Sequence, residues 1–377
     1  MIQNPGILVT ILAFVLVLGP LVFLHELGHY LAGRWFGVKA DEFAIGFGRE
    51  IAGFTDKRGT RWKFGWLPFG GYVHFAGDMN PASQPSPEWL ALPAAERAKT
   101  FQAKPLWQRA IVVAAGPIMN FIVAIVIFAA FAFAYGQNVT PAVIGTVAPK
   151  SAAATAGLQP GDRIVALNGQ HIGDFTDMGV FTVMRAGERV VIDFERAGQA
   201  QRVEAVIGSL ALKDRFGNVS HRGMLGVGPG APVVRPVPLW EAPLVGISQT
   251  VETVQLMVEG LKRIILGQIP VSELGGPLKI AQVSGESLAM GPLALVSLIA
   301  FISINLGFIN LLPVPVLDGG HLLFYAVEAV RRRPVEPQVM EWAYRGGMIA
   351  ILALALFVTL NDLGTFGVWR NLAGLIG

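Results

Sequence analysis

Two histidines four residues apart, His25 and His29, lie in the sequence HELGH together with Glu26. On a helix, residues i and i+4 share one face, so both imidazoles can direct a ring nitrogen at a single metal ion. Glu26 then projects nearby, where a carboxylate can serve as the general base for water. The chemistry that this spacing favours is zinc-dependent hydrolysis.

The surroundings of the HELGH sequence strengthen that interpretation. Residues 7–30 are otherwise almost entirely apolar. Ionisable side chains in a membrane helix are costly to bury and commonly mark a functional site. The alternative is that His25 and His29 end the helix at the level of the lipid headgroups while Glu26 pairs with a nearby arginine.

A hydrolytic zinc site needs a third protein ligand and an open position for water. The chain has no cysteine, so the ligands must come from His, Asp and Glu. Asp318 lies in the sequence NLLPVPVLDGGH after another apolar stretch, where two prolines end a helix and two glycines let the backbone fold back. We expect Asp318 to reach the two histidines, with His321 as a rival ligand.

Four apolar stretches must position these residues, at 7–30, 111–135, 291–312 and, shorter and weaker, 346–363. About 20 helical residues cross the hydrocarbon of a bilayer. The composition, with 53% hydrophobic and only 15% charged residues, argues against a purely soluble protein. The net charge of +3 gives no reason to expect a nucleic-acid partner.

Basic residues in the short flanks predict the orientation in the membrane. No Lys or Arg precedes the first stretch, whereas Arg34 and Lys39 follow it, and residues 331–333 are three arginines. The positive-inside rule then places the N-terminus and residues 137–290 outside, and residues 34–109 and 313–345 in the cytoplasm. The HELGH motif is expected near the cytoplasmic side, and the first stretch is expected to be a retained helix.

The block between the second and third stretches, some 150 residues long, must contain a folded domain. Residues 143–147 predict a strand, and the run AGLQPGDRIVALNG at 156–169 is similar to the core of a PDZ domain. Further strands are expected at 190–195 and 203–207, and Met224 to Val227 resembles a carboxylate-binding loop. Residues 239–266 predict amphipathic helices, either on the outer membrane surface or packed on the PDZ domain as soluble helices.

Residues 43–75 alternate aromatic residues, glycines and charged residues, which predicts short β-hairpins. The aromatic side chains suit a membrane interface. The alternative is a small cytoplasmic hairpin with no role in substrate binding.

HELGH, NLLPVPVLDGG, Gly70 to Val73, the GPIMN sequence at 116–120 and the central domain together resemble the bacterial site-2 protease family of intramembrane zinc metalloproteases, the regulator-of-sigma-E protease group. The resemblance implies that His25, His29 and Asp318 bind Zn²⁺ and that Glu26 is the catalytic base. It further implies that Asn310 holds the substrate and that Gly71, Tyr72 and Val73 pair with a substrate strand. Relatives with two tandem PDZ domains differ from this chain, which has one such block.

The predicted fold is a polytopic α-helical membrane protein of about four transmembrane helices, with an inserted PDZ-like α+β domain and a membrane-associated β-loop. The expected boundaries are 1–36 for the first transmembrane helix with HExxH, 37–107 for the β-loop and linker, 108–137 for the second transmembrane helix, 138–235 for the PDZ domain, 236–290 for the amphipathic region, 291–325 for the third transmembrane helix with the LDG motif, and 326–377 for a cytoplasmic segment and the fourth transmembrane helix.

The predicted function is the cleavage of transmembrane segments by an intramembrane zinc endoprotease. The predicted location is the cytoplasmic (inner) membrane of a bacterium. The expected partners are the lipid bilayer and a membrane-protein substrate with a single transmembrane segment, pre-cut by another protease. An anti-sigma factor or a signal-peptide remnant would be such a substrate. Two alternatives belong to other classes: a catalytically silent PDZ scaffold, and a transporter that uses the intramembrane His and Glu as a proton relay.

Overall fold

The computed structural model describes residues 6–77, 89, 92–183, 185–213, 219–268, 270 and 275–365. The chain forms two compact units. The first, called here the helical unit although it also contains one β-sheet, combines Met1–Ala130 with Ala242–Gly377, and the second is Phe131–Glu241.

Four helices in the described residues are long and apolar enough to cross a membrane. They are α1 (Ile7–Trp35), α4 (Leu106–Tyr135), α9 (Pro292–Asn310) and α11 (Pro337–Thr365). The four predicted stretches are therefore confirmed as helices, but α11 begins nine residues before the predicted start at 346. Its first turns contain Glu341 and Arg345, which form an ion pair at i, i+4 on an exposed face and lower the hydropathy there.

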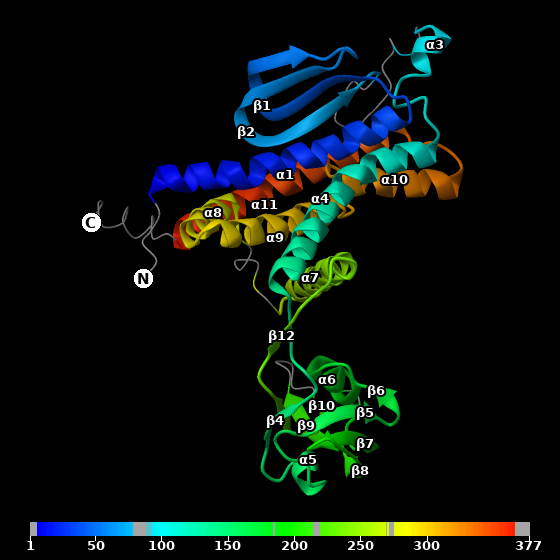
Figure 1. Cartoon of the computed structure of the whole chain (residues 1–377). Coiled ribbons are helices and arrows are strands. Elements are labelled where there is room, and N and C mark those ends of the chain that lie inside the picture. The colour runs from blue at the N-terminus through cyan, green and yellow to red at the C-terminus, as the bar shows by residue number, and fades with distance from the viewer. Residues whose placement is uncertain are drawn as a thin grey trace, which may run out of the picture. The chain divides into compact units, whose positions relative to one another are not determined.

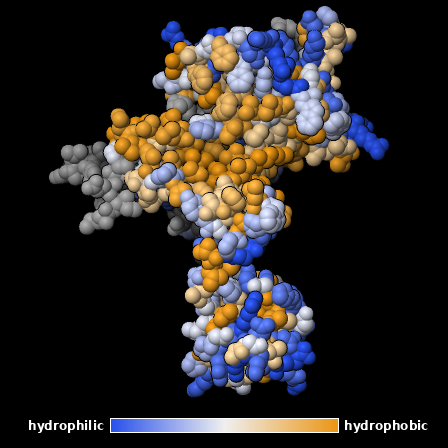
Figure 2. Space-filling view, in the orientation of Figure 1, coloured by the Kyte–Doolittle hydropathy of each residue, from blue (hydrophilic) through white to orange (hydrophobic). Residues whose placement is uncertain are grey.

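The helical unit is held together by apolar side chains between its helices. Helix α1 packs against α8 (Pro277–Met290) and α9, with Val17, Leu21 and Ile302 at the centre of the contact (Figure 1). Ala124 and Ile304 form a second small core between α4 and α9. Figure 2 shows hydrophobic side chains gathered over the outer faces of these helices, which is the surface that lipid would cover.

Helix α7 (Ala242–Ile265) belongs to the helical unit and packs against α4 and α9. A side chain at Gly246 would meet the backbone oxygen of Ile125 on α4 at 2.4 Å, so glycine allows this close approach. Leu244, Ile247 and Val251 are exposed on the outer face of α7. The predicted amphipathic helix is therefore present.

Strands β1 (Ala40–Thr55) and β2 (Arg61–Phe75) form one folded-over sheet and not the predicted series of short hairpins. Residues 42–45 of β1 pair with residues 61–64 on one side and with residues 71–74 on the other, and residues 50–55 pair with 61–65. Gly46 and Gly70 have φ values of +80° and +82°, a conformation that glycine adopts without strain and that lets each long strand bend. The segment 71–75 thus forms one edge of the sheet.

Within the segment 37–107, predicted as β-loop and linker, residues 78–88, 90 and 91 lie outside the described residues. In the described part of this segment, Ala94–Arg97 forms the short helix α3. Later in the chain, α10 (Asp318–Arg331) follows α9 after a short turn.

The second unit is an α+β domain around a separate core that includes Ile144, Ile164, Leu167 and Ile192. Its central sheet has the order β6-β5-β7-β8, and the pairs β4 with β11, β9 with β10 and β3 with β12 surround it. The elements are β3 (Gln137–Val139), β4 (Ile144–Val147), α5 (Ala152–Thr155), β5 (Arg163–Leu167), β6 (Gln170–His171), α6 (Phe175–Val183), β7 (Arg189–Arg196), β8 (Gln199–Val206), β9 (Gly208–Lys213), β10 (Val219–Met224), β11 (Val227–Pro229) and β12 (Val233–Arg235).

The strands expected at 143–147, 190–195 and 203–207 are confirmed as β4, β7 and β8, and the PDZ-like run at 156–169 contains β5. Met224 to Val227, the expected carboxylate-binding loop, leads into β11 and lines a groove of about 530 Å³ together with α6. The fold is that of a membrane protein with four long apolar helices and an inserted PDZ-like domain.

Candidate active site

Helix α1 places His25 and His29 on one face, one turn apart. Both His25 and Glu26 are buried, at 7% and 8% exposure. Helix α4 contacts this face so closely that a side chain at Gly28 would meet the backbone oxygen of Ala115 at 2.4 Å. A side chain at Gly116 would meet Nε2 of His29 at 2.2 Å. Glycines on both helices therefore make room for the histidine rings.

Asp318 comes from a different part of the chain, at the first residue of α10. Helix α9 ends at Asn310, and Pro313 and Pro315 interrupt the backbone before α10 begins. Side chains at Gly319 and Gly320 would collide with the backbone oxygens of Leu311 and Val314, at 2.3 and 2.2 Å. The two glycines thus allow the tight reversal that carries Asp318 back to α1.

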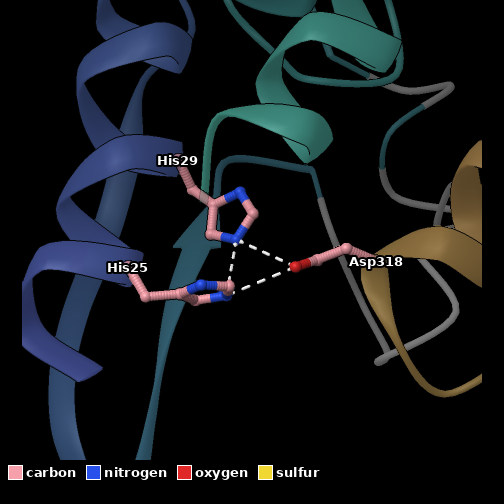
Figure 3. Close-up of side chains that lie close together, drawn as sticks. All are labelled: His25, His29 and Asp318. Carbon is pink, nitrogen blue, oxygen red and sulfur yellow. Dashed lines mark hydrogen bonds and ion pairs between the residues drawn. The ribbon is translucent and has the colours of Figure 1, made fainter. Parts of the chain in front are cut away.

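The two imidazoles and the carboxylate converge on one point, as Figure 3 shows. Oδ2 of Asp318 lies 3.3 Å from Nε2 of His25 and 3.5 Å from Nε2 of His29. The two Nε2 atoms are 3.3 Å apart. One ligand atom from each of the three residues lies within 4.8 Å of the others.

The chemistry of this cluster fits a zinc ion. Two histidines and one carboxylate form a ligand set that catalytic zinc sites use, with the fourth position left for water. Oδ2 of Asp318 is buried and has no hydrogen-bond donor in the described structure. A buried carboxylate oxygen requires compensation, and a cation held between these three groups supplies it.

The backbone oxygen of Val112 on α4 fixes the orientation of the His29 ring. His29 donates a hydrogen bond of 2.8 Å from Nδ1 to that oxygen. Because a carbonyl oxygen can only accept, the proton lies on Nδ1 and Nε2 is left to face the cluster. The His25 ring has its own partner on α4, since its Nδ1 lies 3.0 Å from the side-chain amide of Asn120.

The edge segment of the β1–β2 sheet lies beside the histidines. Gly71, Tyr72 and Val73 line the same cavity as His25, Glu26 and His29. Glu42 accepts hydrogen bonds from Tyr72 and from Lys63, and the Lys63 bond holds the pKa of Glu42 below its usual value. The Lys63 ammonium also lies 5.1 Å from the centre of the Tyr72 ring, so Tyr72 is held in place from two sides.

A cavity of about 750 Å³ surrounds the cluster. Asn310 and His321 both line it, whereas the three-residue cluster contains Asp318 and not His321. The lining residues are His25, Glu26, His29, Phe47, Gly71 to Phe75, Phe101, Val112, Val113, Asn310, Val316 to Asp318, His321, Tyr344 and Met348.

Every predicted site residue therefore lies at one place: His25, Glu26, His29, Asp318, Asn310, and Gly71 to Val73. Sequence reasoning missed the carbonyl of Val112, the side chain of Asn120, and Tyr344 of α11. Every residue type carries a backbone carbonyl, so the residue type at position 112 does not indicate a contact with His29. Asn120 belongs to the GPIMN sequence, which carries part of the family resemblance but gives no signal of a contact with His25.

A membrane helix with an HExxH motif, completed by an aspartate from a distant helix, defines a membrane-bound metalloprotease. The chain belongs to peptidase family M50, whose model matches residues 13–354. It is a zinc metalloprotease of that family, and His25, His29 and Asp318 are its candidate zinc site.

Relatives match over nearly the whole chain. A protein of Agrobacterium fabrum, named as a candidate zinc metalloprotease, is 42% identical over 360 residues, which cover 94% of this chain and 96% of the relative. Metalloprotease MmpA of Caulobacter vibrioides is 35% identical over 400 residues, covering 98% of this chain and 99% of that protein.

A solved structure resembles one part of the chain. The PDZ domain of an SdrC-like protein from Listeria monocytogenes matches with 18% identity and a TM-score of 0.19, covering 24% of this chain and 87% of that domain.

Proposed function

We propose that this chain is an intramembrane endoprotease that cleaves transmembrane segments of other membrane proteins. The observation that carries the proposal is the place of the cluster: two of its residues lie on the apolar helix α1, and the third follows the apolar helix α9. A substrate able to reach these residues is itself embedded in the membrane.

In this proposal His25, His29 and Asp318 hold the metal and Glu26 is the general base. When bound, zinc acts as a Lewis acid that activates water and polarises the scissile carbonyl. Glu26 takes the proton of the attacking water and passes it to the leaving amine. Two observations support this role: Glu26 lines the same cavity as His25 and His29, and its Cγ lies beside Gly71 of the sheet edge.

The sheet edge offers a way to hold the substrate in an extended form. A helical substrate hides its carbonyls in its own hydrogen bonds, so it must unwind locally before attack. Gly71, Tyr72 and Val73 pair with β1 on one side, and no second strand pairs with these three residues in the part of the chain that the structure describes. A substrate strand can add to that edge at Gly71, Tyr72 and Val73, with Asn310 across the cavity as a further polar contact.

The motifs favour the regulator-of-sigma-E group of the site-2 proteases. The substrate is then a protein with a single transmembrane segment that another protease has already cut, such as an anti-sigma factor, or a signal-peptide remnant. The basic flanks at Arg34, Lys39 and 331–333 support a location in the bacterial cytoplasmic membrane, with the PDZ-like domain outside and the active site near the cytoplasmic side.

The test is cleavage of membrane-segment peptides by the purified protein in detergent, with and without a zinc chelator. We expect cleavage that the chelator abolishes and that added zinc restores. A silent PDZ scaffold predicts zinc-independent binding without cleavage, and a proton-relay transporter predicts neither zinc nor cleavage.

A further inference from the structure

Asn120 is a polar side chain buried among the membrane helices. It lies in α4, three residues after Pro117, and is 0% exposed. Its side-chain amide forms a hydrogen bond of 3.0 Å with Nδ1 of His25, 95 residues away in the sequence. The amide nitrogen faces the imidazole, and the side-chain oxygen is buried with no hydrogen-bond partner among the described residues.

The partner of Nδ1 decides what the other ring nitrogen of His25 can do. If the Asn120 nitrogen donates to Nδ1, the proton of the neutral ring must lie on Nε2, which then has no lone pair for a metal. Yet Nε2 of His25 is the ring atom that faces the cluster. It lies 3.3 Å from Oδ2 of Asp318 and 3.3 Å from Nε2 of His29. A ligand role for His25 therefore requires an acceptor at Nδ1.

His29 has such an acceptor. Its Nδ1 donates to the backbone oxygen of Val112, on the same helix α4 as Asn120. Metal-binding histidines generally donate their other ring N–H to an oxygen in this way, which fixes both tautomer and ring orientation. The equivalent oxygen for His25 is within reach if the amide of Asn120 is turned by 180°.

We propose that Asn120 is a positioning residue of the metal site, with its side-chain oxygen accepting a hydrogen bond from Nδ1 of His25. The oxygen and nitrogen of an asparagine amide differ little in shape, so their placement follows from the hydrogen bonds that each can make. The turned amide provides the buried oxygen with a donor and leaves Nε2 of His25 to bind the metal.

The backbone of α4 is fixed at this point by a second helix. Ser303 of α9, itself fully buried, donates a hydrogen bond of 2.7 Å to the backbone oxygen of Asn120. Helix α9 leads through the Pro313–Pro315 turn to Asp318. Asn120 therefore joins His25 to the same helix that leads to the third ligand.

This inference rests on the proposed zinc site, so the experiment measures zinc affinity and not only cleavage. Full-length protein in detergent is stripped of metal, and zinc binding is measured for the wild type, His25→Ala, Asn120→Leu and Asn120→Asp. Leucine keeps the approximate volume without an acceptor, whereas aspartate keeps an oxygen acceptor. We expect Asn120→Leu to weaken zinc binding about 10- to 100-fold and Asn120→Asp to bind about as tightly as the wild type.

A control separates positioning from general stability. Thr250 is a buried polar residue of the same helical unit that donates to the backbone oxygen of Gly246 and does not line the cavity. Thr250→Val is expected to leave zinc affinity unchanged. The rise in Tm that zinc produces should shrink in Asn120→Leu and persist in Thr250→Val.

The outcomes are distinguishable. Zinc affinity of Asn120→Leu equal to that of the wild type, or an equal loss in Asn120→Asp, would overturn the positioning role while leaving the zinc site intact. Wild-type protein that binds no zinc, or His25→Ala that binds it as tightly, would instead overturn the zinc site and the inference with it.

Discussion

A side chain at Gly71 would lie 2.9 Å from Cγ of Glu26 and 2.7 Å from the backbone oxygen of Ala44. The sheet edge and the expected general base are therefore in direct contact, and only glycine fits between them. A substrate strand added at this edge would place its backbone within reach of the Glu26 carboxylate. Because Gly71 has no side chain, Glu26 can lie this close to the strand.

Gly71→Ala is expected to lower cleavage about 10- to 100-fold while zinc content stays at the wild-type level, because the added methyl group must displace Glu26 or the strand. Cleavage rate and zinc content of the purified variant are the measurements. Gly19→Ala on α1 is the matched control, since a side chain there meets nothing within 4 Å. Equal activity of both variants would contradict a close fit at Gly71.

Glu26→Gln is expected to fold, to bind zinc and to lose about 10²- to 10⁴-fold in cleavage rate, because the amide keeps the shape of the side chain but cannot accept the proton of water. The measurements are metal content and single-turnover cleavage of a membrane-segment peptide. Turnover near the wild-type rate would show that another group is the base.

Asp318→Ala is expected to lower zinc affinity by about 100-fold or more, whereas His321→Ala leaves it unchanged. Asp318 contacts both histidines, while His321 lines the cavity outside the three-residue cluster. Zinc titration of the metal-free variants decides between them. The reverse result would make His321 the third ligand.

Local patterns in the sequence predicted much of this site. The spacing of His25 and His29 is a property of one helix, and the prolines and glycines around Asp318 act within a few residues. The PDZ-like domain was predicted for the same reason, because its core residues Ile164 and Leu167 lie in a short run with characteristic turns. Each of these patterns consists of residues that are close together in the sequence, so it can be recognised without knowing how distant segments pack.

The contacts that the sequence could not predict join distant segments. Asn120 meets His25 across 95 residues, and Val112 meets His29 across 83. Arg109 of α4 likewise bonds Glu328 of α10 across 219 residues, which ties the helix bearing these partners to the helix that starts at Asp318. The double pairing of residues 42–45 in the β1–β2 sheet was missed because it depends on glycine bends in both strands.

The PDZ-like unit contains an ion pair between a buried carboxylate and a partly exposed arginine, and its pH dependence is predictable. Asp162 is 1% exposed and accepts hydrogen bonds of 2.7 and 2.6 Å from Arg196, which hold its pKa below the usual value. Because the folded-state pKa lies below that of the unfolded chain, the pair stabilises fully above about pH 4, and the stabilisation is lost as the pH falls through the folded value.

Asp162→Asn is therefore expected to destabilise this unit by about 2 kcal/mol at neutral pH, with the difference from wild type shrinking at about pH 3. Hydrogen exchange over residues 142–206 of the full chain, compared between variant and wild type at each pH, is the measurement. Asp193→Asn, which removes the more exposed pair with Arg202, is the control and should change stability by less than about 0.5 kcal/mol. A difference that persists unchanged at low pH would show that the Asp162 charge is not the cause.

Removal of residues 143–229 tests whether the PDZ-like domain filters substrates by size or recruits them. The deletion keeps the strand pair β3–β12, which connects the domain to the rest of the chain. In this pair Val139 lies opposite Val233, and Gln137 lies opposite Arg235. Gly230 donates a hydrogen bond of 3.0 Å to the backbone oxygen of Val143, so the two cut points are already neighbours and a short Gly-Ser joint closes them.

A filter predicts that the deleted enzyme still cleaves and also accepts substrates with uncut, bulky external domains. The physical reason is that the cluster of His25, His29 and Asp318 lies wholly in the other unit, so the deleted residues remove none of its ligands. A recruiting module predicts the opposite, because loss of the groove lined by α6 and residues 223–227 lowers the local concentration of substrate and raises KM toward every substrate. One membrane segment is presented with either a full or a truncated external domain to full-length and deleted enzyme, and zinc content is measured alongside. Cleavage of both forms by the deleted enzyme supports the filter, whereas reduced cleavage of both forms at wild-type zinc content supports recruitment.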